Sequence, residues 1–300
     1  MVADPARIVL GTAQWGMAYG VANRSGQPSP ELVAEILAVA REAGVTTLDT
    51  ARAYGSSEEV IGALDPAAEW RVVTKLDPDV APPGADATAV RERAETSLRA
   101  SRTALGRSTL DTVLLHRGSQ LAAADGAAWA VLREARADGS VGRIGVSATS
   151  PGEALEALAH PEVEGIQVAA SLLDQRLLRA GFFDRASARG VEVFVRSVYL
   201  QGVAHLDPDA LPPGLAGLRP ALRRIADAAG TLGLTPADLF LAYARDRLPG
   251  RPLIGTETSL QLRENLAAWR RPVDGAALDA VAASVGDLAE DVLDPSQWDA

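Results

Sequence analysis

Hydrophobic and polar positions alternate along the chain in two recurring patterns. Short runs rich in β-branched and aliphatic residues predict buried strands, and longer segments with apolar positions three and four apart predict amphipathic helices. The predicted strands are 7–11, 45–50, 71–75, 110–116, 141–147, 164–169, 191–197 and 252–255. The predicted helices lie near 29–43, 58–64, 86–105, 125–138, 151–159, 175–189 and 258–269, with two more between 219 and 248.

The starts of several helices carry capping signals. A Ser or Thr followed three residues later by Glu or Gln predicts a capping box, and a Thr before Pro predicts an N-cap followed by the first helical residue. The candidates are Ser56 with Glu59, Thr258 with Gln261, and Thr235 before Pro236.

This order of elements predicts the fold. Strands that alternate with helices are expected to pair in parallel, because each crossover helix returns the chain to the same end of the sheet. Eight such units predict a closed (β/α)8 TIM barrel, an α/β fold in which residues 1–300 form a single domain. An open doubly wound sheet is the alternative, but it usually carries G-x-G-x-x-G after its first strand, where this chain has GTAQWG.

One connection stands apart from the others. The segment 200–218 is long, contains several Gly and Pro residues and has no helical period. Loops of this length in compact domains are usually functional, so it is expected to be a lid or a mobile binding loop.

Composition and charge exclude several classes of partner. The formal net charge is −10 and no dense cluster of basic residues offsets it, which argues against nucleic acid. The chain has no cysteine, and its three histidines are far apart, so a metal site has no support. No apolar run approaches the length of a membrane span, and no secretory signal opens the chain. We therefore expect a cytoplasmic protein with no membrane partner; nothing in the sequence indicates an oligomeric state.

Four polar residues follow consecutive predicted strands. Asp49 and Tyr54 follow the second strand, Lys75 ends the third and His116 ends the fourth. Parallel neighbours lie about 4.8 Å apart, so these side chains are expected to form one cluster.

The chemistry of this cluster suits reduction of a carbonyl group. A tyrosine has a reference pKa of about 10 and is a poor proton donor near neutrality, but a nearby cation favours its ionised form. Lys75 can supply that charge, Asp49 can hold the lysine, and His116 can donate a hydrogen bond to the substrate oxygen. Because no side chain supplies hydride, a cofactor is required.

The motifs LDTARAYG, VVTK and LLH resemble the Asp, Tyr, Lys and His tetrad of the aldo-keto reductase family, in the family's order. The resemblance extends from GTAQWG to IGTETSLQLRENL. It implies that an extended nicotinamide dinucleotide, NADPH by default with NADH left open, crosses the barrel mouth. The positions that match cofactor contacts are Thr12, Asp49, Ser147, Gln167, Arg196, Ser197, Gln201, Gly202, Gly255, Thr256, Thr258, Gln261 and Asn265.

The sequence departs from the family pattern in three respects. Ala148 stands where an asparagine usually contacts the carboxamide, and Arg196 stands where many members stack an aromatic ring on the nicotinamide. Gly255 and Gln261 occupy positions at which some members carry basic residues for the 2′-phosphate, and Glu257 lies nearby.

The resemblance implies reduction of an aldehyde or ketone, or the reverse oxidation, on a polar, sugar-like or secondary-metabolite substrate. Trp15, Gln14, Tyr19 and His205 are candidates for the substrate pocket. Each residue also has a structural explanation when taken alone, such as a helix cap or a satisfied loop histidine. A cofactor-binding redox sensor or regulatory subunit with little turnover is the alternative function.

Overall fold

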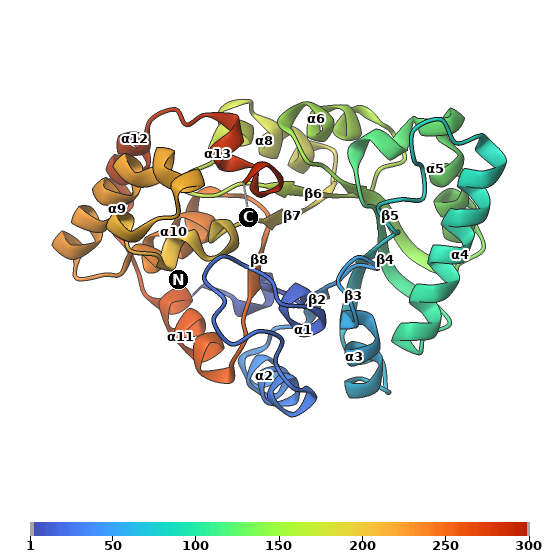
Figure 1. Cartoon of the computed structure of the whole chain (residues 1–300), viewed down its shortest axis with the longest axis horizontal. Coiled ribbons are helices and arrows are strands. Elements are labelled where there is room, and N and C mark those ends of the chain that lie inside the picture. Colours follow the sequence, from blue (N-terminus) through green and yellow to red (C-terminus); the bar gives the residue numbers. More distant parts are fainter. Residues whose placement is uncertain (1–2, 299–300) are drawn as a thin grey trace.

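Eight parallel strands form the centre of the molecule. In the computed structural model, which describes residues 3–298, they close into a ring in chain order, with the last strand pairing with the first (Figure 1). The strands are Val9–Gly11 (β1), Thr47–Asp49 (β2), Arg71–Lys75 (β3), Leu110–Leu115 (β4), Val141–Ser147 (β5), Gly165–Ala169 (β6), Glu192–Arg196 (β7) and Arg251–Gly255 (β8). The predicted TIM barrel is confirmed.

Helices surround this ring (Figure 1). They are Ala13–Gly16 (α1), Pro30–Ala43 (α2), Ser57–Leu64 (α3), Ala87–Leu105 (α4), Ala123–Ala137 (α5), Pro151–Ala159 (α6), Arg176–Arg179 (α7), Phe182–Ala188 (α8), Arg219–Leu232 (α9), Pro236–Arg247 (α10), Ser259–Arg270 (α11), Gly275–Val285 (α12) and Glu290–Leu293 (α13). Short 3-10 helices occur at Pro5–Arg7 (η1), Gly118–Leu121 (η2), Leu200–His205 (η3), Pro208–Ala210 (η4), Pro213–Leu218 (η5) and Pro295–Gln297 (η6). The segment 200–218 is thus a chain of three such turns.

Two helix predictions differ from the structure. The single helix expected at 175–189 is divided into α7 and α8 because Gly181 adopts a left-handed conformation, with φ of 66°. The prediction of a capping box at Ser56 is wrong, since the Ser56 side chain makes no capping hydrogen bond.

The other two capping signals form at least in part. Thr235 and Asp238 make a complete capping box at the start of α10. At α11 the Thr258 hydroxyl accepts a hydrogen bond from the backbone N–H of Gln261 at 3.1 Å. The Gln261 side-chain oxygen accepts from the backbone N–H of Glu257 and not from that of Thr258, so the box is incomplete.

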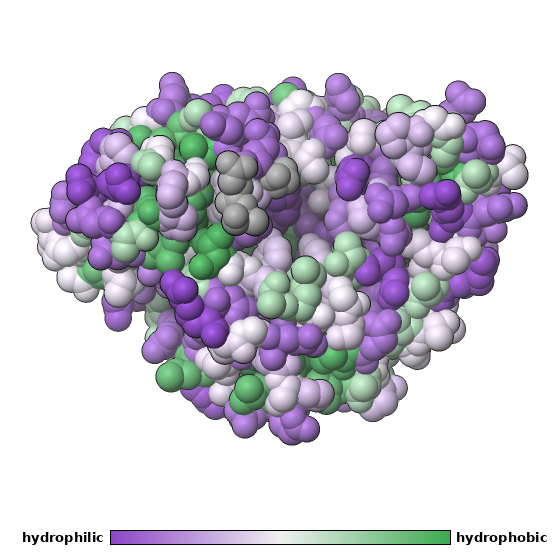
Figure 2. All heavy atoms as spheres, in the orientation of Figure 1, coloured by the Kyte–Doolittle hydropathy of each residue, from purple (hydrophilic) through white to green (hydrophobic). Residues whose placement is uncertain are grey.

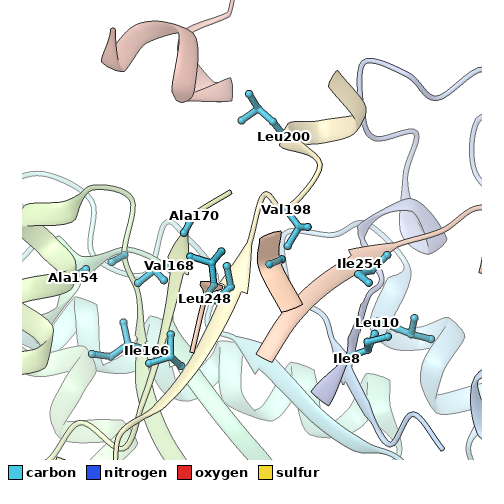
Figure 3. Close-up of a cluster of buried hydrophobic side chains, with 14 of the residues drawn as sticks. Ile8, Leu10, Ala154, Ile166, Val168, Ala170, Val198, Leu200, Leu248 and Ile254 are labelled. Atoms are coloured by element: carbon cyan, nitrogen blue, oxygen red, sulfur yellow. The ribbon is translucent and has the colours of Figure 1, made fainter. Parts of the chain in front are cut away.

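Side chains alternate between the two faces of every strand. Leu10, Leu48, Val72 and Ile166 point outward into the large core between the strands and the helices; Figure 3 shows several members of this core. Their neighbours in sequence point inward. The inward cluster at mid-height consists of Val9, Val73, Leu114 and Phe194, with Leu253 packed against it.

The same alternation continues to both ends of the barrel. Two residues before the apolar inward positions, toward the amino ends of the strands, the inward side chains are polar. They form a network around Glu192, which pairs with Arg71, Arg143 and Arg251. Toward the carboxyl ends of the strands, the next inward positions include Asp49 and Lys75. The barrel interior therefore has three tiers, and only the middle one is apolar.

Polar and apolar residues are interspersed on the face of the molecule drawn in Figure 2. The large hydrophobic residues that are exposed within the described chain are Met17, Leu32, Leu232 and Leu260. Within residues 3–298, no helix is long and apolar enough to cross a membrane.

Candidate active site

The inward alternation brings the predicted polar residues to the carboxyl ends of the strands. Continuing it from the apolar middle tier gives these inward positions: Gly11, Asp49, Lys75, His116, Ser147, Gln167, Arg196 and Gly255. In TIM barrels this end carries the active site.

Lys75 and Asp49 form a buried ion pair at the centre of this end. Lys75 Nζ lies 2.8 Å from Asp49 Oδ1 and donates a second hydrogen bond to the Thr50 carbonyl at 2.9 Å, and both residues are 1% exposed. Burial lowers the pKa of Lys75, but the charge of Asp49 and the neighbouring Tyr54 hydroxyl outweigh burial and raise it overall. The ammonium group is therefore fixed in both position and charge.

Tyr54 lies directly against this ammonium. Lys75 Nζ is 5.0 Å from the centre of the Tyr54 ring. The loop that carries Tyr54 is held by close backbone contact with α1: a Cβ atom at Gly16 would lie 1.8 Å from the Tyr54 carbonyl oxygen, and one at Gly55 would lie 2.2 Å from the Gly16 carbonyl oxygen. Only glycine permits this approach, so the sequence YG after β2 fixes the tyrosine's position.

His116 completes the cluster from the end of β4. Its ring lies 6.5 Å from that of Tyr54 in an edge arrangement, and its Nδ1 lies 3.3 Å from the Leu76 carbonyl oxygen. Burial and then the charge of Lys75 lower the pKa of His116 to about 4, so the imidazole is neutral at pH 7. Because a carbonyl oxygen only accepts, the contact with Leu76 favours the tautomer with the proton on Nδ1, in which Nε2 is an acceptor.

A buried glutamate beside β3 was not predicted. Glu58 is 1% exposed, accepts a hydrogen bond from Thr74 Oγ1 at 2.5 Å and pairs with Arg52. The buried residues of α3 are Ser57, Glu58 and Ile61. Glu58 lies three positions before Ile61, so the helical period placed both on the same buried face and could have identified Glu58.

A cavity of about 420 Å³ opens beside the cluster. The sequence-predicted residues that line it are Thr12, Gln14, Tyr19, Asp49, Tyr54, Gln167, Arg196, Ser197, Gln201, Gly202, His205, Gly255, Gln261 and Asn265. The predicted residues outside the lining are Trp15, Lys75, His116, Ser147, Thr256 and Thr258.

Of the substrate-pocket candidates Trp15, Tyr19 and His205, the last two line the cavity and Trp15 does not. Trp15 is completely buried, and its indole nitrogen donates to the Thr256 carbonyl at 3.2 Å, so it packs beneath the cavity instead of lining it. Tyr19 does line the cavity, and burial raises its pKa. His205 also lines it, with its ring 4.9 Å from that of Tyr199 and its pKa lowered by burial.

Gln167 presents an unused hydrogen-bonding group at the cavity. Its amide nitrogen donates to Asp49 Oδ2 at 2.6 Å, whereas its buried Oε1 has no partner among the described residues. Thr256 Oγ1 is likewise buried and without a partner in the described chain. Since buried polar atoms are normally satisfied, the Gln167 oxygen is available to a group that donates hydrogen bonds, such as a carboxamide.

Arg196 is the one arginine among the described residues that line the cavity. It donates to Ser197 Oγ at 3.3 Å and to the Ala148 carbonyl at 3.2 Å, and no carboxylate of the described chain lies within ion-pair distance. The site thus contains a cation whose charge is unpaired within residues 3–298.

Sequence reasoning missed several lining residues. Glu264 lies one position before Asn265 and three after Gln261, so the helical period already placed it on the same face. Tyr199 lies between two predicted contacts and donates a hydrogen bond to Asn265 Oδ1 at 2.8 Å. Asn23 reaches the cavity from the loop after α1, for which the sequence offered no pattern.

Among residues 3–298, no group of three or more His, Asp or Glu side chains is arranged to hold a metal ion.

Comparison with known proteins gives a consistent assignment. The model of the Aldo/keto reductase family matches residues 7–285. The oxidoreductase sirO of Leptosphaeria maculans is 34% identical over 116 residues, which is 38% of this chain and 34% of that protein, so the match spans about a third of the relative's length.

The fold comparison agrees. Two solved structures named as aldo-keto reductases from Pseudomonas aeruginosa superpose with TM-scores of 0.63 and 0.62, at 22% and 21% identity, over 90% of this chain and 93% of each of theirs. At this level of identity the likeness concerns the fold.

Proposed function

This chain belongs to the aldo/keto reductase family, and we propose that it reduces an aldehyde or ketone to an alcohol with a reduced nicotinamide dinucleotide. The observation that carries the proposal is the buried Lys75–Asp49 pair in contact with Tyr54 at the open end of the barrel. The same residues serve the reverse oxidation.

Tyr54 is the proton donor to the carbonyl oxygen. As the carbonyl carbon gains hydride, negative charge develops on the oxygen, and the phenol neutralises it by giving up its proton. The Lys75 ammonium, 5.0 Å from the centre of the Tyr54 ring, stabilises the negative charge that develops on the reacting oxygens, and Asp49 holds the lysine in place. Because Lys75 and Asp49 are almost fully buried, the ammonium acts more strongly on the phenol than it would in solvent.

The residues at the strand ends fit the dinucleotide. Gln167 Oε1 is free to accept from the carboxamide, and the cavity continues past Ser197, Gln201 and Gly202 to Gln261 on α11. When bound, the cofactor supplies the hydride. NADPH is the form that the family resemblance implies, with NADH as the alternative.

His116 has two possible hydrogen-bonding roles toward the substrate, one for each tautomer. With the proton on Nδ1 its Nε2 accepts, and with the proton on Nε2 it donates to the substrate carbonyl, which is the role that the sequence suggested. We assign it to orienting the substrate by accepting from a hydroxyl group next to the carbonyl. Donation to the carbonyl oxygen requires the proton on Nε2 and therefore loss of the bond to Leu76.

This role agrees with a polar, sugar-like or secondary-metabolite substrate. The cavity walls supply hydroxyl and amide groups from Tyr19, Asn23 and Gln14, whereas His205 lies beside Tyr199 toward α11. Such groups hydrogen-bond to a hydroxylated ligand more readily than to an apolar one.

The test is turnover in the Tyr54→Phe variant. We expect wild-type protein to oxidise NADPH or NADH in the presence of some members of a panel of hydroxylated aldehydes, measured by absorbance of the reduced nicotinamide. Tyr54→Phe should lower kcat at least ~100-fold, within the usual range for general acid catalysis, with dinucleotide Kd nearly unchanged.

Tyr243→Phe is the matched control. Tyr243 is buried in α10, lines no part of the cavity, and its hydroxyl has no partner within the described chain. This variant should retain activity. Tight dinucleotide binding by wild type without turnover on any carbonyl would replace the reductase proposal with the sensor alternative.

A further inference from the structure

The cavity has two chemically different ends. Its inner end lies over the barrel, where Asp49, Tyr54 and Gln167 face inward. Its outer end is formed by the loop after β8 and by α11, a helix of the surrounding layer (Figure 1). If the proposed function holds, the ring that donates hydride lies beside Tyr54, and an extended dinucleotide then brings its adenosine ribose to the outer end.

The outer end carries two carboxylates. Glu257 and Glu264 both line the cavity there, together with the neutral side chains of Gln261 and Asn265. Glu257 Oε2 accepts a hydrogen bond from Ser25 Oγ at 3.1 Å, which does not neutralise its charge. Neither carboxylate is in an ion pair with a basic side chain of the described residues.

No cation of the described chain lines this end to compensate. Arg196 is the one basic side chain among the lining residues besides His205, and it comes from β7 over the barrel. The charge of Glu264 raises the pKa of His205, but partial desolvation of the ring outweighs it and lowers the pKa overall. Arg24 and Arg263 are on the bordering segments, and both are exposed and outside the lining.

We propose that Glu257 and Glu264 make this protein select NADH over NADPH. The two dinucleotides differ at one group: NADH has a ribose 2′-hydroxyl where NADPH has a phosphate. A carboxylate accepts hydrogen bonds from the ribose hydroxyls, as acidic residues do in other NAD sites. A phosphate monoester instead carries about 1.5 to 2 negative charges near neutrality, and here it meets two more without a cation.

The discrimination is measured by binding, which does not depend on turnover. Kd values for NADH and NADPH are determined by quenching of tryptophan fluorescence, checked by calorimetry. We expect wild type to bind NADH at least about tenfold more tightly. In the Glu257→Gln/Glu264→Gln double variant the ratio should shrink at least about fivefold, because both the repulsion and the charged acceptors are lost.

Two controls separate this effect from general ones. Glu92→Gln removes one carboxylate charge at an exposed position of α4, far from the cavity lining, and should leave the ratio unchanged. Added salt should reduce the discrimination in wild type more than in the double variant, because partly exposed charges are screened.

The possible outcomes are distinct. Equal Kd values, tighter binding of NADPH, or a ratio that the double variant leaves unaltered would each overturn the cofactor assignment while leaving carbonyl reduction intact. Failure of wild type to bind either dinucleotide would overturn the proposed function itself.

Discussion

At the scale of single residues, the unpaired charge of Arg196 is the feature that the known fold explains least. Arg107 and Arg176 each contact a carboxylate, whereas Arg7, which is also half-buried, bonds to backbone carbonyls away from the cavity. Arg196 instead makes its hydrogen bonds to a hydroxyl and a carbonyl while lining the cavity. A guanidinium without a carboxylate partner among the described residues is available to pair with an anionic group of a ligand.

Arg196→Ala tests this role. We expect KM for aldehydes that carry a carboxylate to rise about tenfold or more, since a hydrogen bond to a charged group contributes roughly 1.5–3 kcal/mol. KM for neutral aldehydes should change less than about threefold. Arg93→Ala, at an exposed position of α4, is the control. An equal change for both classes of aldehyde would show that Arg196 does not read substrate charge.

The residues of the cluster were predictable because strand alternation and strand ends are local properties. Asp49, Lys75 and His116 each continue the inward alternation of their own strand by one step. The structural role of Trp15 was not predictable, because the partner that accepts from its indole nitrogen, Thr256, is 241 residues away. The proton position on His116 likewise depends on Leu76, on the neighbouring strand's loop.

At the scale of elements, the contact between α1 and the loop after β2 controls where Tyr54 lies. The Ser56 amide donates to the Gly16 carbonyl at 3.3 Å, and no space remains for a side chain at Gly16 or Gly55. Gly16 does not have a positive φ, so its requirement is one of space alone.

Gly16→Ala should therefore displace the Tyr54 loop. The added methyl group has no room beside the Tyr54 carbonyl, so the loop must shift. A displacement on the order of 1 Å is enough to lower kcat about 100-fold. Gly152→Ala is the control, because the nearest atom to its new Cβ would be Ser150 Oγ at 3.8 Å. Unchanged kcat in Gly16→Ala, with the protein folded by circular dichroism, would contradict this account.

The elements themselves were largely predictable, and the exceptions have physical reasons. Each predicted strand overlaps an observed one, because strands buried on both sides read as apolar runs. Helix α12 was not predicted, since the eight repeating units were already complete before Gly275. The capping box predicted at Ser56 does not form. At the start of this helix Glu58 points toward the barrel and accepts a hydrogen bond from Thr74 of β3.

At the scale of the whole molecule, the two ends of the barrel have separate tasks. The end that carries Tyr54 holds a cavity and unsatisfied polar groups, whereas the opposite end is a closed ionic network. There Glu192 accepts from Arg71 at 2.6 and 2.5 Å and also pairs with Arg143 and Arg251. The network thus joins β3, β5, β7 and β8 across the barrel.

Glu192→Gln should destabilise the fold and leave the chemistry intact. Removing the charge leaves three arginines close together without a carboxylate. We expect the free energy of unfolding to fall by about 2 kcal/mol. This is less than for a fully buried ion pair, because these side chains are partly exposed. Glu69→Gln, in an exposed pair with Arg41, should change it by less than about 0.5 kcal/mol. Dinucleotide Kd and kcat should be unchanged in both variants.

The same network gives the stability a pH dependence whose sign is fixed. Burial raises the pKa of Glu192, but the hydrogen bonds and charge of Arg71 outweigh it, so the net shift is downward from 4.5. A carboxyl group with a lowered pKa in the folded state stabilises the protein above its unfolded-state pKa and loses that contribution as the pH falls through the folded value. The difference in unfolding free energy between wild type and Glu192→Gln should therefore be constant above about pH 5.5 and shrink below 4.5. Denaturant titrations across this range measure it, and a difference that grows on acidification would show that Glu192 does not stabilise the barrel through its charge.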